Sequence, residues 1–265
     1  MKKILFSSLL VFVLMLSVVG TAYAVTDGEP DGEGHPYVGL LVFDVNGSPA
    51  WRCSGTLIAP DVVLTAGHCT DGATGGRIWF ESDLQGHPEL GYPYGGPTSV
   101  EFVEIATHPL FPTGSFVLHD VGLVRLASPV DRGGFGTLPT AGQLDDLKVG
   151  KKTKFTSVGY GLQAAFPDAA SWKDEFLKTR MVATPHLIQI NVPGFVGDFS
   201  LLLSNNHATG GTCFGDSGGP NFLGDSNLIA GVTSFGINSN CAGTGGVFRL
   251  DKQDVLDFIY GFMGS

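Results

Sequence analysis

Short apolar segments alternate with turn residues along most of the chain. Each segment is rich in Val, Ile, Leu or Phe and is bounded by Gly, Pro or Asp, a pattern typical of β-strands. The segments that predict strands are 37–45, 51–67, 100–108, 121–127, 153–161, 186–192, 228–236 and 245–250. A mostly β fold is therefore expected. Residues 128–143, rich in Gly and Pro, are interpreted as a connection between two sets of strands.

A helical pattern occurs at the end of the chain. Val255, Phe258, Ile259 and Phe262 are spaced at i, i+3, i+4 and i+7, which places them on one face of a helix. Asp251 precedes this pattern and is predicted to cap the helix. A second, short surface helix is predicted within 171–178 from the charged residues of that segment.

The first 24 residues have the pattern of a secretory signal peptide. Lys2 and Lys3 precede an apolar run over 4–19, and Ala22-Tyr23-Ala24 is a small-x-small cleavage site. An uncleaved membrane anchor is the alternative, but the apolar run is short for a bilayer span. The mature chain is therefore expected to begin at Val25 and to be secreted, outside the cell or into the periplasm, without a membrane attachment.

Acidic residues outnumber basic ones. The chain has 25 Asp and Glu against 15 Lys and Arg, and loss of the two signal-peptide lysines changes the formal net charge from −10 to −12. This negative charge disfavours nucleic acids and anionic membranes as partners. Neither a cofactor nor a metal is expected. Glu81 and Asp83 could ligate calcium, but isolated loop carboxylates are more simply interpreted as solvated.

Four cysteines in an exported chain indicate two disulfide bonds, with three possible pairings. The local pairing, Cys53 with Cys69 and Cys213 with Cys241, is the economical one. A zinc site is the alternative, but the chain lacks the Cys-x-x-Cys pairs that usually form one.

The segment GTCFGDSGGP, residues 211–220, places Ser217 in a Gly-rich turn. It matches the G-x-S-x-G pattern of α/β-hydrolases, in which the catalytic His follows the Ser. All seven histidines precede Ser217, so that chain order is impossible here. An exported esterase on that other fold is disfavoured for the same reason.

Two further residues complete a candidate catalytic set. His68 ends an apolar strand beside Cys69, whose disulfide would fix its backbone, as a general base requires. Asp120 precedes another apolar strand, where a lone Asp is usually a turn residue. His119 is the competing base, but adjacent residues of an extended chain point to opposite sides, so Asp120 is poorly placed to orient it. The order His68, Asp120, Ser217 is one of three known for a Ser-His-Asp triad.

In these segments the chain resembles the chymotrypsin/trypsin family of serine proteases, as a secreted bacterial-type member. The segments that carry the resemblance are CSGTLIAPDVVLTAGHC (53–69), HDVGLVRL (119–126), SVGYG (157–161), CFGDSGGP (213–220) and VTSFG (232–236). Gly67, Gly122 and Phe235 stand where the family usually has Ala, Ala and Trp, and are expected to loosen the packing around the triad without removing a reacting group.

The resemblance covers essentially residues 25–265 and implies an all-β fold. This fold has two six-stranded antiparallel β-barrels and a C-terminal helix. The N-terminal barrel, 25–139, would carry His68 and Asp120, and the C-terminal barrel, 140–265, would carry Ser217 and the specificity pocket.

The resemblance also implies a role for each candidate residue in peptide-bond hydrolysis. Ser217 would attack the carbonyl of a protein or peptide substrate and form an acyl-enzyme, His68 would transfer the proton, and Asp120 would orient the imidazole. The N–H groups of Gly215 and Ser217 would form the oxyanion hole. A monomeric endopeptidase is expected. A catalytically dead relative is the alternative, but such proteins usually lack a triad residue.

A specificity pocket follows from the same resemblance. Its residues would be Gly211, Thr212, Ser234, Phe235, Gly236 and Gly246. Trypsin-like members carry an Asp where this chain has Gly211, so the pocket floor is expected to be uncharged. Gly236 and Gly246 match wall positions that must stay small. Cleavage after Phe, Tyr, Leu or Met is therefore expected.

The start of the mature chain implies a mode of activation. Val25-Thr26-Asp27-Gly28 resembles the Ile-Val-Gly-Gly start of the family, whose free amine pairs with the Asp before the nucleophile, here Asp216. Signal peptidase itself is therefore expected to produce the active form.

Overall fold

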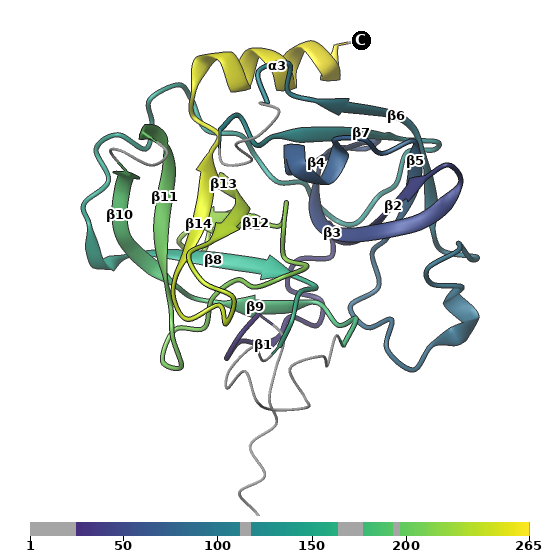
Figure 1. Cartoon of the computed structure of the whole chain (residues 1–265), viewed down its shortest axis with the longest axis horizontal. Coiled ribbons are helices and arrows are strands. Elements are labelled where there is room, and N and C mark those ends of the chain that lie inside the picture. The colour runs from purple at the N-terminus through teal and green to yellow at the C-terminus, as the bar shows by residue number, and fades with distance from the viewer. Residues whose placement is uncertain (1–24, 112–117, 164–176, 193–196, 265) are drawn as a thin grey trace, which may run out of the picture.

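Two β-barrels lie side by side in the computed structural model, which describes residues 25–111, 118–163, 177–192 and 197–264 (Figure 1). The first barrel is closed in the order β2-β3-β4-β7-β6-β5. Its strands are β2 (Val38–Val45), β3 (Ser48–Ala59), β4 (Val62–Thr65), β5 (Gly75–Trp79), β6 (Val100–Thr107) and β7 (Gly122–Leu126). Alternate apolar side chains such as Leu41, Phe43, Leu57 and Val124 fill its interior.

The second barrel is a ring of six strands in the order β8-β10-β11-β14-β13-β12, closed by pairing of β12 with β8. Its strands are β8 (Gly150–Gly159), β10 (His186–Val192), β11 (Gly197–Asn205), β12 (Pro220–Leu223), β13 (Ile229–Gly236) and β14 (Gly243–Arg249). The expected pair of six-stranded antiparallel barrels is therefore confirmed.

Two short strands attach the N-terminal segment to the second barrel. β9 (Met181–Ala183) pairs with β8, and β1 (Glu29–Pro30) pairs with β9. β1 therefore lies on the second barrel although it precedes the first barrel in the chain. The residues that follow Val25 are held against the barrel that carries Ser217.

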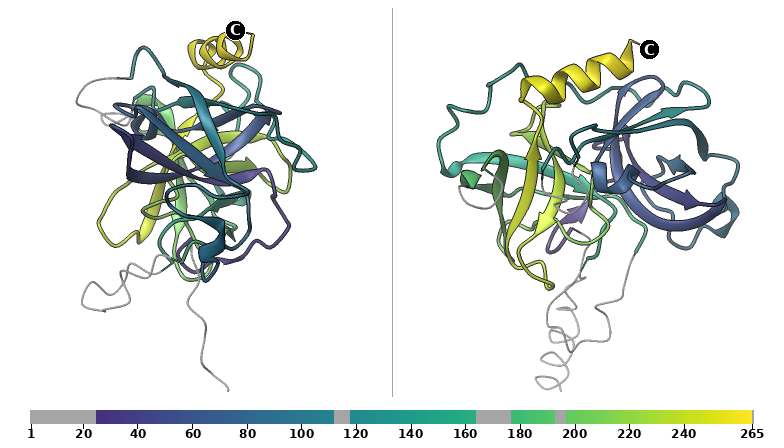
Figure 2. Two further views of the ribbon diagram at one scale, coloured as in Figure 1. Left: turned by 90° about the vertical axis from the view of Figure 1, so that its right-hand side faces the viewer. Right: turned by 45° about the horizontal axis from the view of Figure 1, so that its top comes forward.

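The C-terminal helix is confirmed as α3 (Gln253–Met263) and lies over both barrels (Figure 2). Its buried face, which includes Val255, Ile259 and Phe262, packs into a core cluster with residues of both barrels. In the first barrel, Arg125 donates from Nη2 to the Phe262 carbonyl oxygen at 2.6 Å. Within the described residues, no helix is both long and apolar enough to cross a bilayer.

The predicted helix cap at Asp251 is wrong. The side chain of Asp251 is buried and accepts hydrogen bonds from the Arg249 guanidinium at 2.8 and 2.9 Å and from the Leu144 N–H at 2.8 Å. Lys252 occupies the cap position and makes no side-chain cap bond. A buried guanidinium is a stronger partner for a carboxylate than a helix N–H. The predicted helix within 171–178 lies almost wholly outside the described residues.

Candidate active site

A cavity of about 510 Å³ contains both His68 and Ser217 in its lining. His68 comes from α2 (Gly67–Thr70), directly after β4 of the first barrel, and the other lining residues belong to the second barrel. The two barrels therefore each contribute one of the expected reacting groups. Among the described residues, no Asp, Glu, Lys or Arg lines the cavity.

His68 is oriented by Asp120. Its ring Nδ1 lies 2.9 Å from Asp120 Oδ2, and its backbone N–H donates to Asp120 Oδ1 at 2.8 Å. The His68 side chain is 26% exposed, whereas the Asp120 side chain is fully buried. Ser234 from β13 donates its hydroxyl to Asp120 Oδ2 at 2.5 Å. The carboxylate is thus fixed by three groups, and it holds the His68 ring through Nδ1.

The packing around this pair is tight, contrary to the expectation from Gly67 and Gly122. A Cβ added at Gly67 would lie 2.9 Å from the ring of Phe111, and one at Gly122 would lie 2.5 Å from Thr70 Oγ1. Real Cβ atoms do not approach so closely, so larger neighbours occupy the space that the two glycines leave. Gly122 is therefore required for α2 to lie against β7.

His119 has other partners. Its Nε2 lies 3.0 Å from Asp254 Oδ2 of α3, and its ring stacks on that of His108 with 5.0 Å between centroids. Its φ of +48° belongs to the left-handed region. His119 therefore helps to attach α3 to the segment that carries Asp120, and Asp120 faces His68 instead.

The loop around Ser217 requires glycine on both sides of the serine. Gly215 has φ of +96° and Gly218 has φ of +77°, values that residues with a Cβ rarely adopt. The N–H of Gly218 donates to the Thr233 carbonyl oxygen of β13 at 2.8 Å. These positive φ values form the turn that places Ser217 on the cavity wall.

Four of the six expected pocket residues line the cavity. They are Thr212, Ser234, Phe235 and Gly236. Gly246 does not line it, because a Cβ at this position would lie 2.3 Å from the Phe235 ring. The equivalent atom at Gly245 would lie 2.8 Å from Thr212 Oγ1. Gly245, one residue earlier than expected, therefore lies beside Thr212 of the lining, although Gly245 itself is not among the lining residues.

Gly211, the expected floor, is also absent from the lining, because the side chain of Asn205 from β11 occupies the adjacent space. Asn205 is buried, accepts a hydrogen bond from Thr26 Oγ1 at 2.7 Å and donates from Nδ2 to the Thr212 carbonyl oxygen at 2.8 Å. A neutral amide with both ends bonded thus lies where an Asp side chain at 211 would extend. Its position comes from tertiary pairing, and no motif of the sequence indicated it.

The expected activation pair is buried. Val25 packs against Met181 and Ala183, and the next residue, Thr26, pairs with Gly211. Asp216 accepts hydrogen bonds from the N–H groups of Cys213 and Gly161, each at 2.8 Å. Burial raises the pKa of the Asp216 carboxyl to about 7, although these two N–H groups oppose the shift. In the uncleaved chain the two residues therefore make separate contacts.

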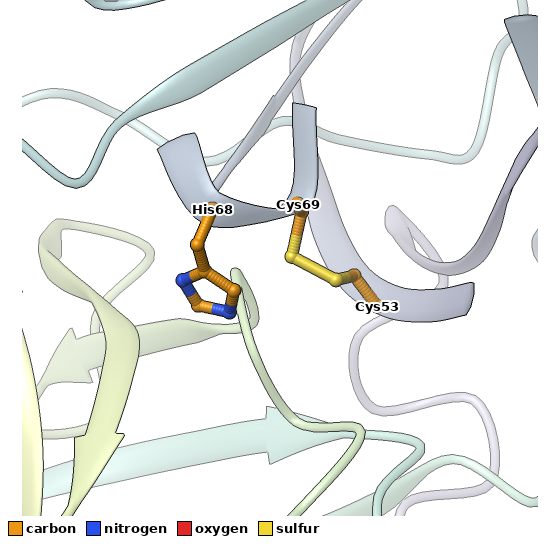
Figure 3. Close-up of side chains that lie close together, drawn as sticks. All are labelled: Cys53, His68 and Cys69. Atoms are coloured by element: carbon orange, nitrogen blue, oxygen red, sulfur yellow. A yellow bond between two sulfur atoms is a disulfide. The ribbon is translucent and has the colours of Figure 1, made fainter. Parts of the chain in front are cut away.

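Both expected disulfides are present, Cys53–Cys69 and Cys213–Cys241. Figure 3 shows His68 beside the first of them. The ligand atoms of Cys53, His68 and Cys69 lie within 4.8 Å of one another, but a disulfide has no thiolate to bind a metal. The first disulfide anchors the His68 segment, and the second lies in the cavity wall.

Comparisons with known proteins agree with this geometry. A family model described as Trypsin matches residues 27–259. Brachyurin of Leptuca pugilator is 32% identical over 193 residues, which cover 71% of this chain and 77% of brachyurin. Serine protease 1 of Drosophila melanogaster is 30% identical over 221 residues, 82% of this chain and 77% of the relative. The solved structure of HL collagenase has a TM-score of 0.71 at 23% identity and covers 91% of this chain and 99% of that chain.

Proposed function

Because the chain belongs to the trypsin family of serine proteases, we propose that His68, Asp120 and Ser217 form the catalytic triad of a secreted endopeptidase. The observation that carries this proposal is the Asp120–His68 contact of 2.9 Å at the edge of a cavity that also contains Ser217. We also propose the two units 25–139 and 140–265, one for each barrel. The signal pattern of residues 1–24 and the two disulfides support secretion.

The proposed chemistry assigns one step to each of these groups. His68 Nε2 takes the proton of Ser217 Oγ as the oxygen attacks the scissile carbonyl, and Asp120 stabilises the imidazolium through Nδ1. The N–H groups of Gly215 and Ser217 stabilise the oxyanion of the tetrahedral intermediate. The imidazolium then protonates the leaving amine, and water repeats the sequence to release the acyl group.

The experiment that tests this function is cleavage-site profiling of a mixed peptide library with the purified mature chain. Labelling by a serine-directed fluorophosphonate separates an active protease from a catalytically dead relative. Peptide cleavage with a label on Ser217 is expected. A folded chain that neither cleaves nor reacts would contradict the proposal.

We further propose a preference for large apolar residues before the scissile bond. The cavity lining lacks a charged carboxylate or ammonium among the described residues, and Asn205, which donates to the Thr212 carbonyl oxygen, supplies only a neutral amide hydrogen-bonded at both its oxygen and its nitrogen. A substrate cation would lie there without a partner. The N–H and C=O groups of residues 234–236 would pair with the substrate backbone as an added strand.

The preference for large apolar side chains is expected to depend on Gly236. On matched peptides with Phe, Leu, Ala, Glu or Arg before the bond, kcat/KM should be highest for Phe or Leu. Gly236→Val should lower kcat/KM for Phe at least about tenfold and affect Ala much less, because a side chain at 236 narrows a cavity that this residue lines. A dominant preference for Arg or Glu in the parent protein, or an equal loss for Phe and Ala in the variant, would contradict this pocket assignment.

We propose that cleavage after Ala24 activates the chain, since the new ammonium of Val25 can pair with the buried carboxylate of Asp216. Two observations support this. Val25 is already buried beside the second barrel, and Thr26 is already paired with Gly211. The pairing would place an opposite charge near a carboxyl whose pKa burial raises to about 7.

The pKa of Asp216 predicts how an N-terminally extended form responds to pH. A carboxyl whose folded pKa is raised from 3.8 to about 7 stabilises the fold fully below pH 4, and this stability is lost as pH rises through 7. We compare two N-terminally extended proteins, one with Asp216 and one with Asp216→Asn. Between pH 4 and pH 8 the unfolding free energy of the Asp216 protein should fall by roughly 4 kcal/mol more than that of the variant. Urea unfolding of both proteins at each pH measures the difference. A pH-independent difference would show that Asp216 is not held in this environment.

A further inference from the structure

Ser54 connects the first barrel to the nucleophile loop, which we define as residues 213–218. It belongs to β3, adjoins Cys53 and is fully buried. Its backbone N–H donates to the carbonyl oxygen of Ser217 at 2.8 Å, and its hydroxyl donates to the carbonyl oxygen of Gly215 at 3.0 Å. One residue of the barrel that lacks the nucleophile therefore holds the loop at two positions.

A third contact fixes the direction of the hydroxyl proton. The N–H of Tyr160 donates to Ser54 Oγ at 3.0 Å. Because a backbone N–H can only donate, the oxygen accepts in this contact, and its single proton remains for the Gly215 carbonyl. Ser54 itself has no exposed surface, so bulk water does not reach its hydroxyl, although the Gly215 end of this hydrogen bond is only partly buried. In the contact with Gly215, the Ser54 hydroxyl is therefore always the donor and the Gly215 carbonyl oxygen the acceptor.

The peptide bonds on both sides of Gly215 are held in this way. The carbonyl oxygen of Phe214 accepts a hydrogen bond from the Leu162 N–H at 2.8 Å. Since the peptide unit is planar and trans, the Gly215 N–H in the same unit points away from Leu162. The next peptide unit is held at both ends, because the Gly215 carbonyl accepts from the Ser54 hydroxyl and the Asp216 N–H donates to the Cys213 carbonyl oxygen at 3.0 Å. Loss of the Ser54 hydroxyl removes one of these two restraints next to a glycine at φ of +96°, which tolerates more alternative backbone angles than other residues.

We propose that the Ser54 hydroxyl is a positioning group for the oxyanion hole, keeping the Gly215 N–H directed at the oxygen of the substrate carbonyl. The proposal rests on the proposed function, because it assigns Ser54 a part in the same reaction. Ser54 does not touch the substrate. It acts through Gly215, so its contribution belongs to the transition state, where the oxygen carries negative charge, more than to substrate binding.

Ser54→Ala in the mature protein tests this role. The variant should lower kcat and kcat/KM by the same factor, about tenfold, with KM unchanged, because an aligned donor matters most to the charged oxygen. Affinity for a peptide aldehyde, whose adduct with Ser217 carries the same oxyanion, should fall by a similar factor. Rates are normalised to the number of active sites titrated with a fluorophosphonate, which removes the effect of any unfolded fraction.

Thr56→Val is the matched control. Thr56 lies on the same strand, is buried, and its hydroxyl has no hydrogen-bond partner among the residues that the structure describes, so its removal should leave kcat and aldehyde affinity unchanged. Ser54→Gly, which also lacks the hydroxyl but keeps the N–H bond to Ser217, serves as a second variant if Ser54→Ala does not fold. It should show the same loss of kcat.

The outcomes separate the two proposals. Unchanged kcat in an active Ser54→Ala protein, a rise in KM alone, or an equal loss in Thr56→Val would overturn the role of Ser54 and leave the protease assignment intact. A folded parent protein that cleaves no peptide and does not react with the fluorophosphonate would overturn the proposed function instead.

Discussion

Replacing Ser217 with Ala is expected to lower kcat for peptide hydrolysis by a factor on the order of 10⁶, to a residual rate that reflects binding and the oxyanion hole alone. The loss is large because the Ser217 hydroxyl is the nucleophile of the proposed mechanism, and an Ala side chain cannot form the acyl-enzyme. Single-turnover and steady-state assays on the best library peptide, with the same peptide in the absence of protein as reference, measure the effect.

Two further variants serve as comparisons, one within the proposed triad and one outside the cavity. Asp120→Asn should cost about 10⁴-fold in kcat, because the amide stabilises the wrong tautomer of His68 while preserving the geometry. Ser226→Ala, in the turn between β12 and β13 where its hydroxyl donates to the Leu223 carbonyl oxygen at 2.7 Å, removes a Ser far from the cavity lining and should retain full activity. Retention of activity in Ser217→Ala would refute the assignment of the nucleophile.

One additional residue before Val25 is expected to lower kcat/KM by about 10²- to 10³-fold, the cost of losing an oxyanion-hole donor. The reason is that an amide at position 25 cannot provide the ammonium that Asp216 needs when its buried carboxyl ionises. Proteins beginning at Val25 and at Ala24 can be compared on the same peptide, after mass spectrometry of each N-terminus.

A matched control uses the same two N-termini in an Asp216→Asn background. Without the carboxylate, the free amine has no partner, so both forms should be equally impaired. Full activity of the protein that begins at Ala24 would show that the loop contacts of the uncleaved chain suffice. The signal-peptidase step would then have no part in activation.

The strands that the sequence predicted are those whose apolar residues form a run bounded by turn residues. β2, β6, β10 and β13 agree closely with predicted segments, and the predicted segment 51–67 is divided by a turn at Pro60 into β3 and β4.

β1, β5, β9, β11 and β12 were not predicted. β1 consists of Glu29 and Pro30, both exposed, and exists only because their backbone pairs with β9. β5 begins with two glycines and contains Arg77, which is buried because it pairs with Asp44. Such strands depend on their partners, and local composition does not indicate them.

In the candidate site, too, some residues could be predicted from the sequence and others could not. His68, Asp120 and Ser217 could be found because their chain order and flanking motifs are distinctive, and the structure brings His68 and Asp120 into contact. The pocket was less predictable. Asn205 lies beside Gly211 because the chain turns back after β11, where Asn206 bridges to Gly210, and the one-residue difference between Gly245 and Gly246 depends on strand register. Ser234 was expected only to line the pocket, yet its hydroxyl also contacts Asp120.

Each end of the described chain packs against the barrel that is distant from it in the sequence. β1 pairs with β9 on the second barrel, and α3 contacts Arg125 and His119 of the first. Neither barrel can therefore complete its packing with its own half of the chain alone. The N-terminal segment pairs only when residues 181–183 are in place, and the first barrel is covered only when α3 has formed. The two barrels therefore depend on each other for their final packing, although each closes its own ring of strands.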